Sequence, residues 1–155
     1  MSLTLHLGVL DINHRNVQAG KKGKKSTRTT GDIAEILESK YHIMRIFLEL
    51  HEKDIVRELE EGLQRAHNTI LGGGPIDLDA FGEGTSKITA MMKDFLANKE
   101  MEKIGYPGVP TKAALKGVNH RLKHPYSKRN PKPRASFIDT GQYQAAMKAW
   151  IDSNA

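Results

Sequence analysis

The stretch that decides the fold is residues 32–71, DIAEILESKYHIMRIFLELHEKDIVRELEEGLQRAHNTIL. Apolar residues recur in it at spacings of three and four, from Ile33 to Ile70, which is the period of an α-helix with one apolar face. Thr30 or Asp32 can cap its start, and Gly72-Gly73-Gly74-Pro75 ends it. The sequence therefore predicts one long amphipathic helix in the N-terminal half.

The length of this helix has a consequence for packing. Unbroken, it would be about 60 Å long, which exceeds the diameter of a globule of 155 residues. We expect the helix either to kink, with Gly62 as the candidate position, or to place part of its apolar face against another chain.

Outward from the helix, shorter elements are expected. Residues 3–9 alternate apolar and polar, which predicts a half-buried strand whose partner comes from elsewhere in the chain or from another subunit. A second helix is expected from Thr85 or Ser86 to about Ile104, and Thr111 can cap a shorter helix after it. Residues 137–138 are expected to be extended. Asp139 or Thr140 can cap a last helix, whose apolar face would comprise Tyr143, Ala146, Met147, Trp150 and Ile151.

The expected fold class is thus mainly α (α+β), with a long amphipathic helix, two or three shorter helices, few strands and extended basic loops. We expect residues 1–155 to form a single domain.

Positive charge is concentrated in two runs. Residues 13–30 hold six basic residues and no acid, and residues 111–136 hold eight and no acid. Removing these 14 from the 24 Lys and Arg leaves 10 to face all 18 acids, so the rest of the chain carries a net charge of −8. Such segregation attracts partners of opposite charge.

The first run and the later part of the second run are predicted to be loops. Residues 13–30 are rich in Gly, Lys, Ser and Thr without periodicity, which predicts a flexible basic loop, and residues 123–136 form a Pro-rich basic loop. Few aromatic residues lie near them, which disfavours sequence-specific nucleic-acid recognition. The candidate contacts to DNA or to an acidic protein partner are Lys21, Lys22, Lys24, Lys25, Arg28, Arg121, Lys123, Lys128, Arg129, Lys132 and Arg134.

Composition excludes several kinds of chemistry. The chain has no cysteine, so disulfides and thiolate chemistry are absent. No apolar run approaches the roughly 20 residues that span a bilayer, and no signal peptide is evident, so we expect no membrane partner and a cytoplasmic origin. We expect no cofactor, no metal ion and no catalytic residue.

Two motifs suggest chemistry but have a simpler interpretation. Asp139-Thr140-Gly141 matches the tripeptide of aspartic proteases, but that chemistry needs a β scaffold, and a helix cap and turn explain it better. His120 and His124 have the spacing of a zinc-binding pair on a helix, but no third ligand is evident and Pro125 follows directly.

The C-terminal half carries a family resemblance. It rests on residues 81–86 (FGEGTS), 108–117 (GVPTKAALKG), 136–145 (SFIDTGQYQA) and 148–151 (KAWI), separated by the basic Pro-containing loop. These segments resemble the small neck, head–tail connector and tail-completion or tail-terminator proteins of tailed bacteriophages. The resemblance implies a structural virion protein without enzymatic activity that forms a ring on the path of the genome.

Two functional hypotheses follow. The first is a ring-forming component of the neck, head–tail connector or tail end, located in the virion and assembled in the host cytoplasm. Its partners would be other copies of itself, neighbouring neck or tail proteins, and DNA passing through the channel. The alternative is a non-specific nucleic-acid-binding protein that uses the two basic loops. The candidate subunit-interface residues are Leu3, Leu5, Leu48 and Ile55.

Overall fold

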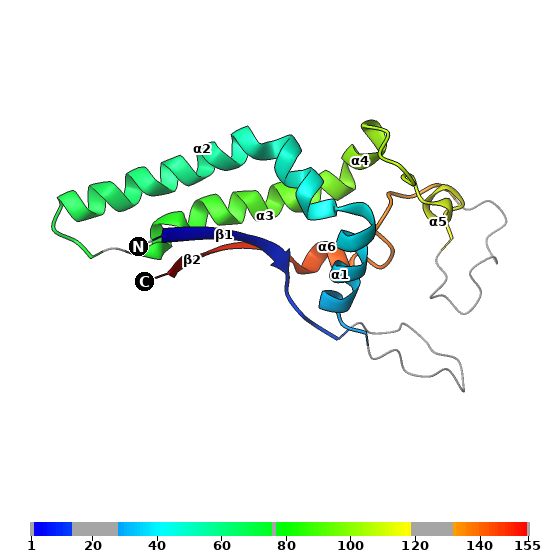
Figure 1. Ribbon diagram of the computed structural model, residues 1–155, viewed down its shortest axis with the longest axis horizontal. Coiled ribbons are helices and arrows are strands. Elements are labelled where there is room, and N and C mark those ends of the chain that lie inside the picture. The colour runs from blue at the N-terminus through cyan, green and yellow to red at the C-terminus, as the bar shows by residue number, and fades with distance from the viewer. Residues whose placement is uncertain (1, 14–27, 76, 119–131, 155) are drawn as a thin grey trace. The chain divides into compact units, whose positions relative to one another are not determined.

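The computed structural model describes residues 2–13, 28–75, 77–118 and 132–154. Their elements follow in the order β1 (Ser2–Val9), α1 (Thr30–Tyr41), α2 (Ile43–Leu71), a 3-10 helix η1 (Leu78–Phe81), α3 (Gly82–Ala97), α4 (Glu100–Lys103), α5 (Lys112–Leu115), α6 (Gln142–Ala146) and β2 (Met147–Asn154) (Figure 1). The fold is mainly helical with one small sheet, so the expected fold class is confirmed.

The long helix breaks at His42 and not at Gly62. His42 has a left-handed backbone, with φ 52° and ψ 43°, and it separates α1 from α2. The Glu38 carboxylate accepts hydrogen bonds from the backbone N–H groups of Met44, at 2.7 Å, and Arg45, at 3.3 Å. Glu38 thereby satisfies donors at the start of α2 that have no intrahelical partner. The kink predicted near Gly62 is wrong, because α2 runs through that residue.

The middle of the chain follows the expected order with shifted boundaries. The glycines after Leu71 end α2 as predicted, with Gly72 N–H donating to Asn68 O at 3.0 Å. α3 begins at Gly82, before the expected Thr85, and ends at Ala97. Lys99, with φ 56°, then separates it from the single turn of α4.

The last part of the chain holds one confirmed helix start and two corrections. The Thr111 hydroxyl accepts from Ala114 N–H at 3.2 Å and caps α5, as predicted. Residues 137–138 are not an extended segment, because Phe137 lies in a turn with φ 67°. The predicted last helix stops at Ala146, and Met147, Trp150 and Ile151 belong to strand β2.

Strand β2 is the partner that β1 requires. The two strands form a two-stranded sheet and run antiparallel (Figure 1). Leu10 N–H donates to Ala146 O at 2.7 Å just beyond the strand ends, and the His6 ring stacks on Trp150 at 5.2 Å. Of the two sources left open for the strand's partner, the structure therefore selects the same chain.

The chain forms two compact units, each assembled from distant segments. Unit 1 comprises Met1–Gly8, Leu37–Met92 and Met147–Ala155, and unit 2 comprises Val9–Ile36 and Lys93–Ala146. The apolar core of unit 1 includes Ile43, Phe47, Ile55, Phe81, Ile88, Met92, Met147 and Ala149. That of unit 2 includes Phe95, Leu96, Met101, Val109, Ala114, Val118, Tyr143 and Ala146. The expected single domain stays a prediction.

Candidate assembly interface

Unit 1 contains an open apolar groove of about 250 Å³. Strands β1 and β2 form one wall, helix α2 forms another, and Phe81 of η1 contributes to the lining. The lining side chains are Leu3, Leu5, Val56, Leu59, Glu60, Leu63, Phe81 and Ile151. Seven of these eight residues are apolar, so water in the groove has few hydrogen-bonding partners.

The Phe81 side of the groove is fixed by close packing between α2 and η1. Gly62 is buried in α2, and a Cβ atom built on it would lie 2.5 Å from Phe81 Cδ1, so only glycine leaves room for the ring. The Arg65 Nε–H donates to Ala80 O at 3.0 Å and holds η1 beside the helix. Asp77 caps η1 by accepting from Asp79 N–H at 2.9 Å.

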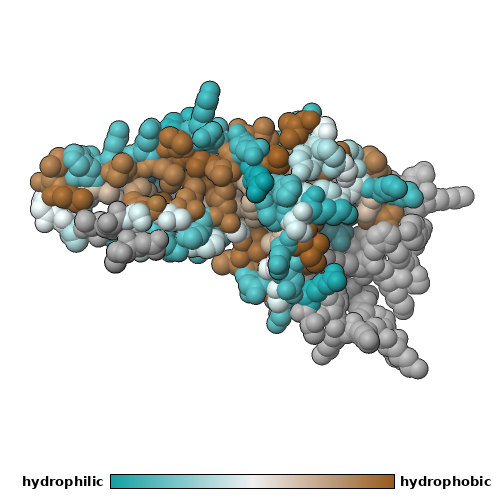
Figure 2. Space-filling model, viewed as in Figure 1, coloured by the Kyte–Doolittle hydropathy of each residue, from teal (hydrophilic) through white to brown (hydrophobic). Residues whose placement is uncertain are grey.

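The groove walls are exposed in the single chain. Leu3 is 42% exposed, Val56 45% and Leu63 57%. Further exposed apolar side chains on α2 are Leu48, Leu50, Ile70 and Leu71. Figure 2 shows apolar side chains gathered on this face over the region of α2. Contiguous apolar surface of this kind marks interaction sites in folded proteins.

A charged cluster in unit 1 fastens α3 to α2. The Lys87 ammonium lies 3.0 Å from the Glu58 carboxylate of α2 and 3.1 Å from Glu83 on its own helix. The hydrogen bonds to Glu58 and then Glu83 raise the pKa of Lys87 to about 12. The hydrogen bond from Lys87, followed by its charge and that of Arg65, lowers the pKa of Glu83. Because Glu58 is buried, this cluster has a structural role in holding α3 against α2.

The predicted interface residues fall into two groups. Leu3 and Leu5 line the groove, and Leu48 is exposed on α2 outside the lining. Ile55 is only 2% exposed, so it is a core residue of its own chain and is not available for contact with a subunit. The prediction that Ile55 contacts another subunit is therefore wrong, because its side chain faces the core of its own chain.

Five apolar groove residues, as well as Glu60, were not predicted as interface residues. Leu59 and Leu63 fit the apolar period of the helix, but periodicity does not reveal which positions stay uncovered. Ile151 was assigned to the apolar face of a helix and lies on a strand. Val56 and Phe81 are apolar positions whose place at the groove depends on how η1 packs against α2.

Most of the predicted basic contacts lie outside the described residues. They are Lys21, Lys22, Lys24, Lys25, Arg121, Lys123, Lys128 and Arg129. His120, His124 and most of the two predicted loops also lie outside the described residues. Arg28 and Lys132 are described and exposed. Arg134 is only partly exposed, and its guanidinium donates to the carbonyls of Ala135, Ile138 and Val118. Arg134 therefore organises the local backbone.

Asp139 lies beside Arg134. Its Oδ1 is 3.5 Å from Arg134 Nη2, and its side chain is 25% exposed. The hydroxyl of the next residue, Thr140, accepts from Gln142 N–H at 3.4 Å at the start of α6. Asp139-Thr140-Gly141 thus leads into helix α6, and its Asp139 forms an ion pair with Arg134.

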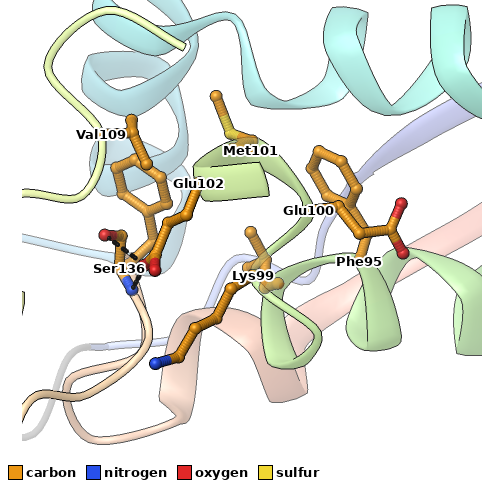
Figure 3. A pocket seen from close by; sticks show the side chains of 9 residues that line it. Phe95, Lys99, Glu100, Met101, Glu102, Val109 and Ser136 are labelled. Atoms are coloured by element: carbon orange, nitrogen blue, oxygen red, sulfur yellow. Dashed lines mark hydrogen bonds between the residues drawn. The ribbon is translucent and has the colours of Figure 1, made fainter. Parts of the chain in front are cut away.

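Unit 2 contains a second hollow, of about 10 Å³, shown in Figure 3. On one side of it, the Glu102 carboxylate accepts hydrogen bonds from the N–H and hydroxyl of Ser136, each at 2.9 Å. The Ser136 hydroxyl accepts in turn from Thr111 N–H at 3.1 Å. A hollow of this volume holds at most about one water molecule, so these bonds join segments of the fold and leave no room for a substrate.

Charge divides between the units. Unit 1 has seven basic and 11 acidic residues, a net charge of −4, whereas unit 2 has 17 basic and seven acidic residues, a net charge of +10. These sum to the +6 of the whole chain. The groove therefore belongs to the acidic unit, and both basic runs belong to the other.

Comparison with protein-family models, curated proteins and solved structures gives no match to this chain. Within the described part of the chain, no helix combines the length and the apolar character that crossing a membrane requires. In the same residues, no three His, Asp or Glu side chains gather in a way that could hold a metal ion.

Proposed function

We propose that this protein is a structural component of a tailed-phage virion. It forms a homo-oligomeric ring in the neck, in the head–tail connector or at the end of the tail, alongside neighbouring neck or tail proteins. The observation that carries the proposal is the apolar groove of unit 1, whose walls include Leu3, Val56 and Leu63, all about half exposed. The resemblance of residues 81–86, 108–117, 136–145 and 148–151 to phage neck and tail proteins supports the virion assignment.

The size of the groove sets a requirement on the contact. Covering one half-exposed leucine or valine contributes on the order of 1 kcal/mol. Association itself costs about 4–15 kcal/mol. The groove alone is therefore insufficient, and the contact must also use other exposed apolar residues of α2, such as Leu48, and the opposite charges of the two units.

Light scattering after size-exclusion chromatography tests the proposal. We expect a mass that is a multiple of 17.3 kDa at high protein concentration, with rings visible by negative-stain microscopy. A monomer at every accessible concentration, with no rings, contradicts the proposal.

Non-specific nucleic-acid binding is a second candidate. The net charge of +10 on unit 2 favours it, because contacts with phosphates need little more than clustered Lys and Arg. Fluorescence anisotropy with labelled duplex DNA would then show binding that weakens steeply with salt and does not depend on sequence. Binding that is absent at low salt argues against this candidate.

A further inference from the structure

We propose that the groove of one copy receives Leu115 of the next copy, with Lys112 and Lys116 of that copy facing the acidic residues of α2. This inference rests on the assembly function proposed above and names the two surfaces that meet. It makes the contact head-to-tail, with a different surface from each partner.

Leu115 is an exposed apolar side chain on a fixed backbone. It is 54% exposed at the end of α5, whereas its neighbour Ala114 is fully buried. Thr111 caps the turn, and Arg134 N–H donates to Ala114 O at 3.0 Å. Because this turn is held from both sides, little conformational freedom is lost when the leucine docks.

The charges around Leu115 distinguish it from the other exposed apolar residues of unit 2. The remaining ones in the described residues are Leu10, Ile12, Ile36 and Ile104. Each of these has an acid at an adjacent position or within two residues. Leu115 lies instead in the acid-free run, between the exposed lysines Lys112 and Lys116.

The groove presents the complementary arrangement. Glu52 and Glu60 are both exposed and lie one turn before and one turn after Val56, on the same face of α2. Their backbones are about 12 Å apart along the helix, so an apolar side chain carried between two lysines can enter the groove between them. The groove volume of about 250 Å³ is also below the roughly 300–1,000 Å³ of small-molecule sites.

A two-fold contact of groove with groove is disfavoured. It would bring the Glu60 side chains of two acidic units close together, and like charges repel across an interface. A contact between unlike surfaces closes into a ring when the rotation between copies allows it.

Disulfide trapping tests the inference, because the chain contains no cysteine. Leu63→Cys and Leu115→Cys are made in separately purified full-length chains that carry tags of different size, then mixed and mildly oxidised. Any disulfide must then join two copies. We expect the mixed Leu63→Cys/Leu115→Cys adduct to be several-fold more abundant than either homodimer.

Leu71→Cys provides the control for exposure. Leu71 is 73% exposed, more than Leu63, but it does not line the groove. A mixture of Leu71→Cys and Leu115→Cys should give several-fold less adduct. Equal yields would mean that the contact is not specific to the groove and would overturn the inference.

Charge reversal gives an independent measurement. Glu60→Lys should weaken self-association about tenfold, and combining it with Lys112→Glu and Lys116→Glu should restore it.

The outcomes separate the two levels of the proposal. If the wild-type chain is monomeric throughout, the proposed function fails. If it assembles but Leu63→Cys homodimers dominate, or charge reversal has no effect, the head-to-tail docking is wrong and the assembly function stands.

Discussion

Single residues set how closely helices approach in unit 1. A Cβ atom built on Gly84 would lie 2.8 Å from the Glu58 carbonyl oxygen, whereas one on Gly82 meets nothing within 4 Å. Backbone atoms cannot move aside as a flexible side chain can, so α3 would be forced away from α2.

We therefore predict that Gly84→Ala destabilises the fold by about 1–2 kcal/mol, since overpacking outweighs the helix-propensity gain of about 1 kcal/mol. Gly82→Ala is the matched control and should leave stability unchanged or slightly raised. Urea unfolding monitored by the fluorescence of the single tryptophan, Trp150, provides the measurement. Equal stability of the two variants would show that the close approach is not needed.

A buried hydroxyl in unit 2 is the second residue-scale feature. The Thr30 side chain is fully buried, donates to Leu10 O and accepts from Ile12 N–H at 2.9 Å. Thr30→Val keeps the shape and removes both bonds, leaving Leu10 O and Ile12 N–H without these partners. We expect Thr30→Val to lower the free energy of unfolding by about 1–3 kcal/mol, measured by thermal denaturation. Thr30→Ser keeps the hydroxyl and should lose less than half as much. If Thr30→Val and Thr30→Ser lower stability equally, the loss comes from packing and not from the two hydrogen bonds.

At the scale of elements, the tie between α2 and α3 makes stability depend on pH. Folding raises the pKa of Lys87 from the ordinary 10.5 to about 12. The folded state thus holds this proton more tightly than the unfolded chain, so the stabilisation is complete below pH 10.5 and is lost as the pH rises through 12.

We predict that wild type exceeds Lys87→Met in stability near neutral pH and that the difference shrinks over this alkaline range. Paired urea titrations provide the measurement, because other lysines and tyrosines cancel in the comparison. A difference independent of pH would mean that Lys87 acts through its aliphatic chain.

The elements also show how far the sequence alone could predict the fold. The long helical region, its glycine stop and the Thr111 cap follow from local rules and are confirmed. The break at His42 was not predicted, because it depends on Glu38 capping α2 from six residues away.

Strand β2 was assigned to a helix, although Met147 and Ala149 are buried while Lys148 between them is exposed. That alternation is short, and Gln142, Ala145 and Ala146 before it favour a helix. Pairing with β1, more than 130 residues earlier, overrides this local preference.

At the scale of the molecule, substitutions at two positions on α2 distinguish effects on folding from effects on the proposed assembly. Leu48 is 43% exposed and Ile55 is 2% exposed. We predict that Leu48→Asp keeps the wild-type circular dichroism and melting temperature but weakens self-association about tenfold. Ile55→Asp should prevent folding, since a buried unpaired carboxylate costs several kcal/mol. Light scattering and circular dichroism on both variants provide the test. If the Leu48→Asp chain assembles normally, the surface of α2 around Leu48 is not part of the interface.

The candidate site could be predicted only in part. Leu3 and Leu5, which the alternation of residues 3–9 places on one face of a strand, line the groove, and the segregation of charge follows directly from counting residues. The other wall could not be located, because which apolar residues of a helix stay uncovered depends on how η1 and β2 pack around it.

The pairing of β1 with β2 also governs when the groove exists during synthesis. Leu3 and Leu5 leave the ribosome first, but Ile151, on the partner strand, follows almost 150 residues later. At about 5–20 residues per second, this delay is on the order of ten seconds. During that time the nascent chain has no completed sheet and therefore no finished groove. Under the proposed assembly, copies translated side by side from one message could dock through the groove only after each has completed its C-terminal strand.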